Sequence, residues 1–279
     1  MLRTSPLPVR GRVVAVTGGA RGIGERTAGL LTRLGARVAI GDIDEERCAE
    51  TAGRLGLACH GRLDVTDPES FAAFLDRVES ELGPLDVLVN NAGIMPVGPL
   101  LDESDAVARR MVEINVLGVI TGTKLALRRM APRGSGHIVN VASLGGEMCV
   151  PGVASYIGTK HAVVGFTDAA RLEFRTAGVR FSSVLPWFTN TELVSGTKGI
   201  RFLPNAEPED VAAAIAATLR RPRARVRVTA LHGALVQAGR FLPRSVTEGV
   251  QRVLGAESVF LGDVDDEARR AYEDRVRSL

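Results

Sequence analysis

The sequence predicts an α/β fold in which a doubly wound, mostly parallel sheet carries a C-terminal helical appendage. Two observations predict it. Over about the first 190 residues, short β-branched runs alternate with longer amphipathic stretches, which is typical of βαβ units covered by helices on both faces. The 279 residues, 45% of them apolar, also suffice to bury a sizeable core in one large domain or two small ones.

Buried strands are predicted where β-branched residues gather into short apolar runs. We expect them at residues 12–17, 37–41, 58–63, 86–90, 136–141 and 179–185. Helices are expected between them, near residues 23–34, 44–55, 67–82, 103–131 and 154–177. Asp67 is predicted to cap one of these helices, because the Pro68 that follows suits a first turn. A helix over 208–220 and a strand over 224–229 would complete the sheet.

The C-terminal part departs from this alternation. Residues 1–229 are predicted to form the main domain, which binds the ligand, and residues 230–279 a helical extension packed on the same domain. Apolar residues in the extension recur at roughly helical spacing, with interruptions at Gly239 and Pro243. The extension is therefore expected to contain more than one helix.

Composition and charge exclude several classes of protein. An aromatic fraction of 4%, with 31 Gly and 13 Pro, is typical of a soluble globular protein and excludes collagen-like, low-complexity and disordered chains. Residues 220–252 hold eight Arg and one Glu, yet we expect no nucleic-acid partner. Three widely spaced cysteines and four scattered histidines predict neither disulfides nor a metal site. Without a secretory signal or an apolar run of about 18 residues, the chain is predicted to be cytoplasmic.

A glycine-rich stretch, TGGARGIG, follows the first predicted strand and opens the first predicted helix. Glycines at this place let the backbone approach a pyrophosphate, and the helix N-terminus supplies oriented N–H groups. The spacing is G-x-x-x-G-x-G, which differs from the usual dinucleotide fingerprint, so a purely structural turn is the alternative. The candidate cofactor contacts of this Rossmann-type motif are Gly18, Arg21, Gly22, Ile23 and Gly24.

Asp42 ends the second predicted strand, about 20 residues beyond the glycines. A carboxylate here can accept hydrogen bonds from the adenosine ribose and repel a 2′-phosphate, which favours NAD. Arg21 could instead pair with a 2′-phosphate, which keeps NADP possible, or lie solvated at the surface. Because a 2′-phosphate close to the Asp42 carboxylate would place like charges together in a confined site, which is costly, we favour the interpretation from Asp42.

Two further strand ends carry candidate cofactor contacts. Asp64 and Val65 follow the third predicted strand and could meet the adenine. Asn91, Ala92 and Gly93 belong to an Asn-Asn-Ala-Gly turn after the fourth strand, at the sheet edge where such folds bind ligands. Each signal is also compatible with a simple turn or a helix cap.

The most specific constellation is Ser143 with Tyr156 and Lys160. Ser143 follows a predicted strand, and the Tyr-x-x-x-Lys pair shares one face of a helix. A phenol with a pKa of about 10 is a poor base at neutral pH, but an adjacent ammonium stabilises the phenolate. We therefore expect Lys160 to lower the pKa of Tyr156 toward the working range.

These motifs occur in the order found in the short-chain dehydrogenase/reductase family, which the chain resembles over roughly residues 10–230. The resemblance implies hydride transfer between the nicotinamide and a substrate carbinol carbon, with proton transfer at Tyr156. It implies that Ser143 hydrogen-bonds the substrate oxygen and that Lys160 holds the nicotinamide ribose. Asn115 matches the helix position that holds a water joining Lys160 to solvent, and it completes a catalytic tetrad.

The loop after the sixth predicted strand departs from the family pattern. Where the family usually has Pro-Gly, this chain has Pro186 followed by Trp187, so an indole replaces a glycine. Thr191 still falls where the family's Thr meets the carboxamide, and Pro186 and Thr189 are candidate cofactor contacts beside it. Trp187 is alternatively a wall of the substrate pocket.

The leading hypothesis is an NAD-dependent alcohol dehydrogenase or ketone reductase for an apolar, steroid-like or lipid-like secondary alcohol. The candidate pocket residues are nearly all apolar: Met148, Cys149, Val150, Leu193, Val194 and Phe202. A cofactor-binding sensor or scaffold, and a peripheral membrane-associated reductase, are the alternatives. The preferred interpretation of the basic segment is a cover over the substrate cleft or a dimer edge. The resemblance implies homodimers or homotetramers built through the helices near 103–131 and 154–177.

Overall fold

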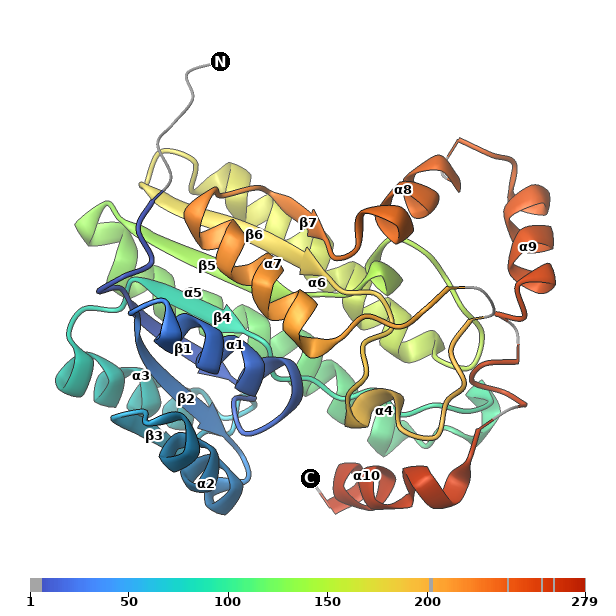
Figure 1. Ribbon diagram of the computed structural model, residues 1–279, viewed down its shortest axis with the longest axis horizontal. Helices are drawn as coiled ribbons and strands as arrows, with labels where there is room; N and C mark the ends of the chain where they lie inside the picture. The colour runs from blue at the N-terminus through green and yellow to red at the C-terminus, as the bar shows by residue number, and fades with distance from the viewer. Residues whose placement is uncertain (1–6, 201–202, 240, 257, 263, 279) are drawn as a thin grey trace.

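The computed structural model describes residues 7–200, 203–239, 241–256, 258–262 and 264–278. Its centre is one seven-stranded sheet with the strand order β3-β2-β1-β4-β5-β6-β7 (Figure 1). The strands are β1 (Val13–Thr17), β2 (Arg37–Asp42), β3 (Cys59–Arg62), β4 (Val87–Asn90), β5 (Gly136–Val141), β6 (Val179–Leu185) and β7 (Arg225–Arg227). All the pairings between these strands are parallel, so the predicted doubly wound α/β fold is confirmed.

Helices cover both faces of the sheet, as a parallel sheet requires. They are α1 (Gly22–Arg33), α2 (Glu45–Leu55), α3 (Pro68–Leu82), α4 (Asp105–Val112), α5 (Gly118–Met130), α6 (Ala154–Glu173) and α7 (Pro208–Arg220). One apolar core lies between the sheet and α1, α2 and α7, and another between the sheet, α3, α5 and α6. Asp67 caps α3 as predicted, since its side chain accepts from the Glu69 N–H at 2.9 Å. The strand order reverses between β1 and β4, which is where such folds bind ligands.

The helical stretch predicted near 103–131 contains one irregularity. The chain is helical there, but a π-helical turn at Glu113–Leu117 separates α4 from α5. Asn115 lies in this turn and is fully buried. π-Helical turns are rare overall, but they occur frequently at functional sites. The spacing of apolar residues in the sequence cannot reveal the one extra residue that such a turn contains.

The described residues of the C-terminal extension form three helices, α8 (Ala230–Gly239), α9 (Arg244–Val253) and α10 (Asp266–Ser278). The interruption between α8 and α9 falls at Gly239 and Pro243, as the sequence predicts. Figure 1 shows α8 and α9 projecting from the body of the molecule, whereas α10 is hydrogen-bonded to the loop at Leu193 and Ser195. None of the helices in the described ranges combines the length and hydropathy needed to span a bilayer.

Candidate active site

A cavity of about 260 Å³ lies at the carboxyl ends of the strands. Most of the predicted site residues line it: Gly18, Arg21, Gly22, Ile23, Asp42, Asp64, Val65, Asn91, Ala92, Gly93, Ser143, Tyr156, Lys160, Pro186, Thr189 and Thr191. Two predicted site residues, Gly24 and Asn115, do not line the cavity. Gly24 packs α1 against the preceding loop, where a Cβ would come within 2.1 Å of the Gly18 carbonyl oxygen. Asn115 is fully buried and does not line the cavity.

The glycine loop is shaped by close backbone contacts. Gly18 has a φ of +63°, and a Cβ there would lie 2.9 Å from the Ala92 Cα. The Asn91 side-chain amide donates to the carbonyls of Thr17 and Gly18, both at 3.0 Å, which joins the loop to the turn after β4. Arg21 precedes α1 and does not cap it with its side chain. The first N–H groups of α1 are therefore suited to an anion at the cavity.

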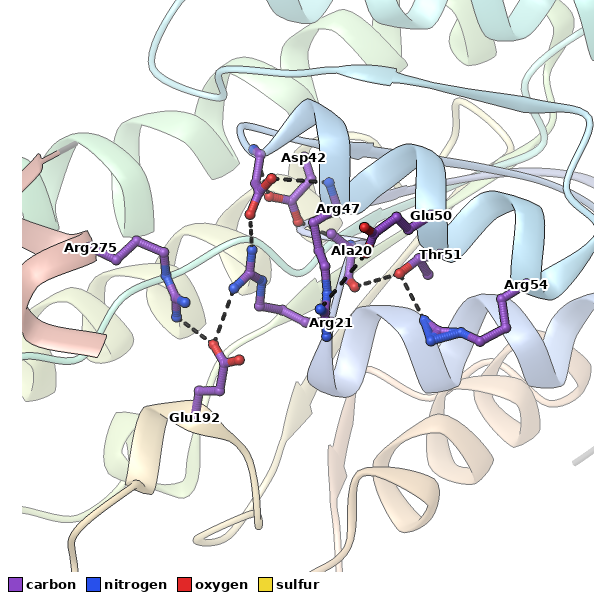
Figure 2. Close-up of polar contacts among 10 residues, drawn as sticks. Ala20, Arg21, Asp42, Arg47, Glu50, Thr51, Arg54, Glu192 and Arg275 are labelled. Carbon is purple, nitrogen blue, oxygen red and sulfur yellow. Dashed lines mark hydrogen bonds and ion pairs between the residues drawn. The ribbon is translucent and has the colours of Figure 1, made fainter. Parts of the chain in front are cut away.

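Asp42 and Arg21 are both held in place by neighbours (Figure 2). The Asp42 carboxylate accepts from the backbone N–H of Ala20 at 3.0 Å and of Asp44 at 3.2 Å. Burial raises the pKa of Asp42, while these hydrogen bonds oppose the shift. The Arg21 guanidinium pairs with Asp44 and, at 3.4 Å, with Glu192. Arg21 is thus engaged by two carboxylates rather than solvated.

Ser143, Tyr156 and Lys160 come together as predicted from their spacing. The Ser143 and Tyr156 side chains are hydrogen-bonded, and both residues line the cavity. Lys160 follows one turn later on α6, with its Nζ 5.5 Å from the centroid of the Tyr156 ring. The Lys160 ammonium donates to the Val141 carbonyl at the end of β5, at 3.1 Å. The three side chains therefore form one compact polar group.

The predicted lowering of the Tyr156 pKa by Lys160 is absent from this geometry. Burial raises the pKa of Tyr156 to about 12, although the hydrogen bond with Ser143 opposes the shift. Burial also lowers the pKa of Lys160 to about 8. Removal from water disfavours the charged form of each group, and the ammonium is directed at a main-chain carbonyl rather than at the phenol oxygen.

The Asn115 side chain is hydrogen-bonded to the backbone just after the Asn-Asn-Ala-Gly turn. Its side chain accepts from the Ile94 N–H and donates to the Ile94 carbonyl, both at 2.9 Å. A Cβ at Gly93 would lie 3.1 Å from the Asn115 oxygen and 3.7 Å from the Lys160 Nζ. The π-helical turn thus brings Asn115 close to Lys160, although Asn115 itself does not line the cavity.

The rest of the cavity wall is largely apolar. Of the predicted pocket residues, Met148, Val150, Leu193 and Val194 line it. Cys149 is exposed and does not line it, and Phe202 lies outside the described residues. Trp187 also lines the cavity, and its ring stacks on His232 with the centroids 4.7 Å apart. Its position therefore agrees with the alternative prediction, in which Trp187 is a wall of the pocket.

Sequence reasoning missed the contribution of the C-terminus. Phe260 and three residues of α10, Tyr272, Arg275 and Val276, line the cavity. The basic segment, which we expected as a cover over the cleft or a dimer edge, contributes none of the cavity-lining residues within its described parts, 220–239 and 241–252. The i, i+4 spacing of Tyr272 and Val276 is the one signal that could have indicated a buried helix face here.

Comparisons with known proteins agree with this architecture. A family model described as short chain dehydrogenase matches residues 12–199. The chain is 42% identical over 212 residues to cis-4-hydroxycyclohexanecarboxylate dehydrogenase of Sinomonas cyclohexanicum, covering 74% of this chain and 80% of that protein. It is 36% identical over 184 residues to 3-alpha-(or 20-beta)-hydroxysteroid dehydrogenase of Mycobacterium tuberculosis, covering 66% and 71%. It is 38% identical over 190 residues to probable oxidoreductase EphD of the same species, covering 66% of this chain but only 32% of that longer protein.

Proposed function

Because the chain belongs to the short-chain dehydrogenase family, whose members are oxidoreductases acting on CH–OH groups, we propose that it oxidises an apolar secondary alcohol with NAD or reduces the matching ketone. The observation that carries the proposal is the hydrogen-bonded Ser143–Tyr156 pair beside Lys160, in the same cavity as the glycine loop. In the oxidative direction the alcohol loses a hydride and a proton and becomes a ketone.

The residues of the cavity near the glycine loop fit a nicotinamide dinucleotide. Gly18 lies so close to Ala92 that no side chain fits at this position, so main-chain atoms would face the pyrophosphate next to the N-terminus of α1. Thr191 meets this loop, since a Cβ at Gly22 would lie 3.3 Å from its methyl group. Asp64 and Val65 would lie at the adenine, and Pro186, Thr189 and Thr191 at the carboxamide.

The roles of the polar group follow from its contacts. When bound, the cofactor supplies or accepts the hydride. Tyr156 gives or takes the proton at the substrate oxygen, and Ser143, its hydrogen-bond partner, contacts the same oxygen. Lys160 holds the nicotinamide ribose with its ammonium. Asn115 fixes the backbone of Ile94 and so supports the turn that precedes it.

The choice of NAD rests on Asp42, at the end of β2, and on Arg21, in the glycine loop before α1. Asp42 is held by two backbone N–H groups, so its carboxylate is positioned for ribose hydroxyls. Arg21 already pairs with Asp44 and Glu192, which leaves it poorly placed to neutralise a 2′-phosphate. The apolar wall and the names of the relatives, which describe a hydroxysteroid and a hydroxycyclohexanecarboxylate, support an alicyclic alcohol.

We expect kcat/KM for cyclohexanol or a hydroxysteroid to be at least tenfold higher with NAD than with NADP, a difference of about 1.4 kcal/mol or more. We also expect no turnover of small polar sugars. Initial rates with both cofactors measure this, and a larger thermal shift with NADH than with NADPH reports binding alone. Asp42→Asn should reduce the preference for NAD. A preference for NADP, or turnover of sugars only, would contradict the proposal.

The predicted quaternary structure and location remain proposals. The exposed apolar residues Val112 and Leu117 lie at the junction of α4 and α5, and Leu172 lies on α6. These are the helices through which the family resemblance implies a homodimer or homotetramer. The widely spaced cysteines support a reducing, cytoplasmic location.

A second candidate function is contact with an anionic membrane surface through α8 and α9. Large apolar side chains there are exposed: Leu231, Leu235, Phe241, Leu242, Val246, Val250 and Val253. Such a patch marks an interaction site, and residues 231–253 carry three Arg and one Glu, a formal charge of 3 − 1 = +2 that suits anionic lipid.

We expect the full-length protein to pellet with vesicles containing phosphatidylserine and to remain in solution with pure phosphatidylcholine vesicles. The double variant Val246→Ser/Val250→Ser should lose this binding, because it removes adjacent apolar contacts of α9 and leaves the charge unchanged. Leu34→Ser, at the end of α1, is the matched control, because it removes an exposed apolar side chain outside the helices assigned to the oligomer. Equal behaviour with both vesicles removes the membrane proposal, and a dimer lost in the double variant would assign the surface to a second copy of the chain.

A further inference from the structure

Helix α10 is attached to both loops that flank the substrate end of the cavity. Arg269 is only 2% exposed, and its guanidinium donates to the carbonyls of Leu193 at 2.9 Å and Ser195 at 3.1 Å. It also donates to the Met95 carbonyl at 2.5 Å, in the segment after β4. Glu273 completes the group with an ion pair at 2.6 Å. The helix is therefore a fixed wall of the site.

Tyr272 lies on the cavity face of this wall. It is 4% exposed, and its hydroxyl oxygen accepts from the Met95 N–H at 2.7 Å. A phenol has one donor as well as acceptor capacity. Within the described part of the chain, the Tyr272 hydroxyl takes part in that single hydrogen bond, as acceptor, so its own hydrogen has no protein acceptor there.

The surroundings of Tyr272 leave this donor available to a ligand. Burial raises the pKa of Tyr272, so the hydroxyl keeps its hydrogen at neutral pH. Phe260 and Val276 also line the cavity, and their side chains offer no acceptor. An apolar pocket with few polar groups uses each of them to fix the orientation of its ligand.

The charged neighbour Arg275 indicates which kind of ligand group would meet this donor. Its guanidinium pairs with Glu192 at 2.5 Å and lies over the Tyr272 ring, 5.4 Å from the centroid. Figure 2 shows Arg275 directed at Glu192, which also pairs with Arg21. Because the positive charge is matched by a carboxylate of the protein, the wall favours a neutral oxygen over an anionic group.

We propose that the Tyr272 hydroxyl donates a hydrogen bond to a second, neutral oxygen of the substrate, so that the substrate class is an apolar alicyclic alcohol or ketone with a further carbonyl or hydroxyl group. This inference rests on the proposed function, since it deepens the description of the same site. Tyr156 and Tyr272 then hold the substrate from two oxygens, and Tyr272 is a residue of substrate binding rather than of proton transfer.

The test compares ketone pairs that differ only in the second oxygen, with NADH as the reductant. The pairs are cyclohexanone with 1,4-cyclohexanedione, and androstan-3-one with androstane-3,17-dione. In the unsubstituted protein we expect kcat/KM of the dione to exceed that of the monoketone in at least one pair. In Tyr272→Phe the ratio of kcat/KM for the dione to kcat/KM for the monoketone should fall by about 2-fold to 10-fold, as for one neutral hydrogen bond.

A merely structural role of Tyr272 would give a different result. Loss of the contact with Met95 would lower kcat/KM for the monoketone and the dione alike, and a ratio unchanged by the substitution in both pairs overturns the inference. Tyr272→Gln offers both an acceptor and a donor and should retain part of the advantage. Failure of the wider proposal is separate, because in that case the unsubstituted protein would reduce none of the four ketones.

Discussion

Tyr156→Phe is expected to lower kcat by about 10³-fold or more, while the protein still folds and binds NADH. The substitution removes one hydroxyl, the group that is hydrogen-bonded to Ser143 and lies beside Lys160 in the cavity. The aromatic ring stays, so packing of this buried residue changes little. The measurement is kcat for ketone reduction, together with the thermal shift produced by NADH.

The pH dependence provides a second measurement on the same residue. Burial raises the pKa of Tyr156 to about 12, so the phenol is protonated throughout the neutral range. Ketone reduction, which consumes the phenol proton, should therefore be nearly independent of pH between about 6 and 8. Alcohol oxidation needs the phenolate, and its rate should rise by about tenfold per pH unit until Lys160, with a pKa of about 8, loses its charge.

Tyr272→Phe is the matched control, because it removes the hydroxyl of the other tyrosine that lines the cavity. It should leave kcat for a monoketone within a few-fold of the original value. If Tyr156→Phe retained a tenth or more of the activity, another group would have to carry the proton, and the assignment of Tyr156 would fail.

The strands and the positions of the polar group follow from local patterns in the sequence. Buried β-branched runs identify parallel strands, and the i, i+4 spacing of Tyr156 and Lys160 places both on one side of α6. The predicted lowering of the Tyr156 pKa by Lys160 is absent, and burial raises that pKa instead. That effect depends on burial and on where the ammonium points, and neither is encoded in the spacing.

Contacts between distant segments could not be predicted in this way. Arg225 and Arg227 count toward the basic surplus of residues 220–252, yet both bind Glu147, at 2.8 and 2.6 Å. Arg225 also pairs with Asp168. Glu147 precedes these residues by about 80 positions and lies just after Ser143, so a local charge count overstates the basic surface of the molecule.

Arg269→Met is expected to destabilise the protein by about 3 kcal/mol and to lower kcat/KM more than the affinity for NADH. The buried guanidinium joins Leu193, Ser195 and Met95 to α10, so its loss leaves three carbonyls and the Glu273 carboxylate without their donor. A loss of this size corresponds to a melting temperature lower by about 5–10 °C. Thermal unfolding and steady-state kinetics measure the two effects.

The double variant Arg269→Met/Glu273→Met separates the two sources of this loss. Removing Glu273 as well eliminates the unpaired carboxylate, so part of the stability should return, since the penalty of an uncompensated charge disappears. The activity should not return, because neither methionine can bind the carbonyls of the two loops. Recovery of both would show that α10 only covers the cavity, whereas recovery of stability alone assigns to Arg269 the positioning of the substrate wall.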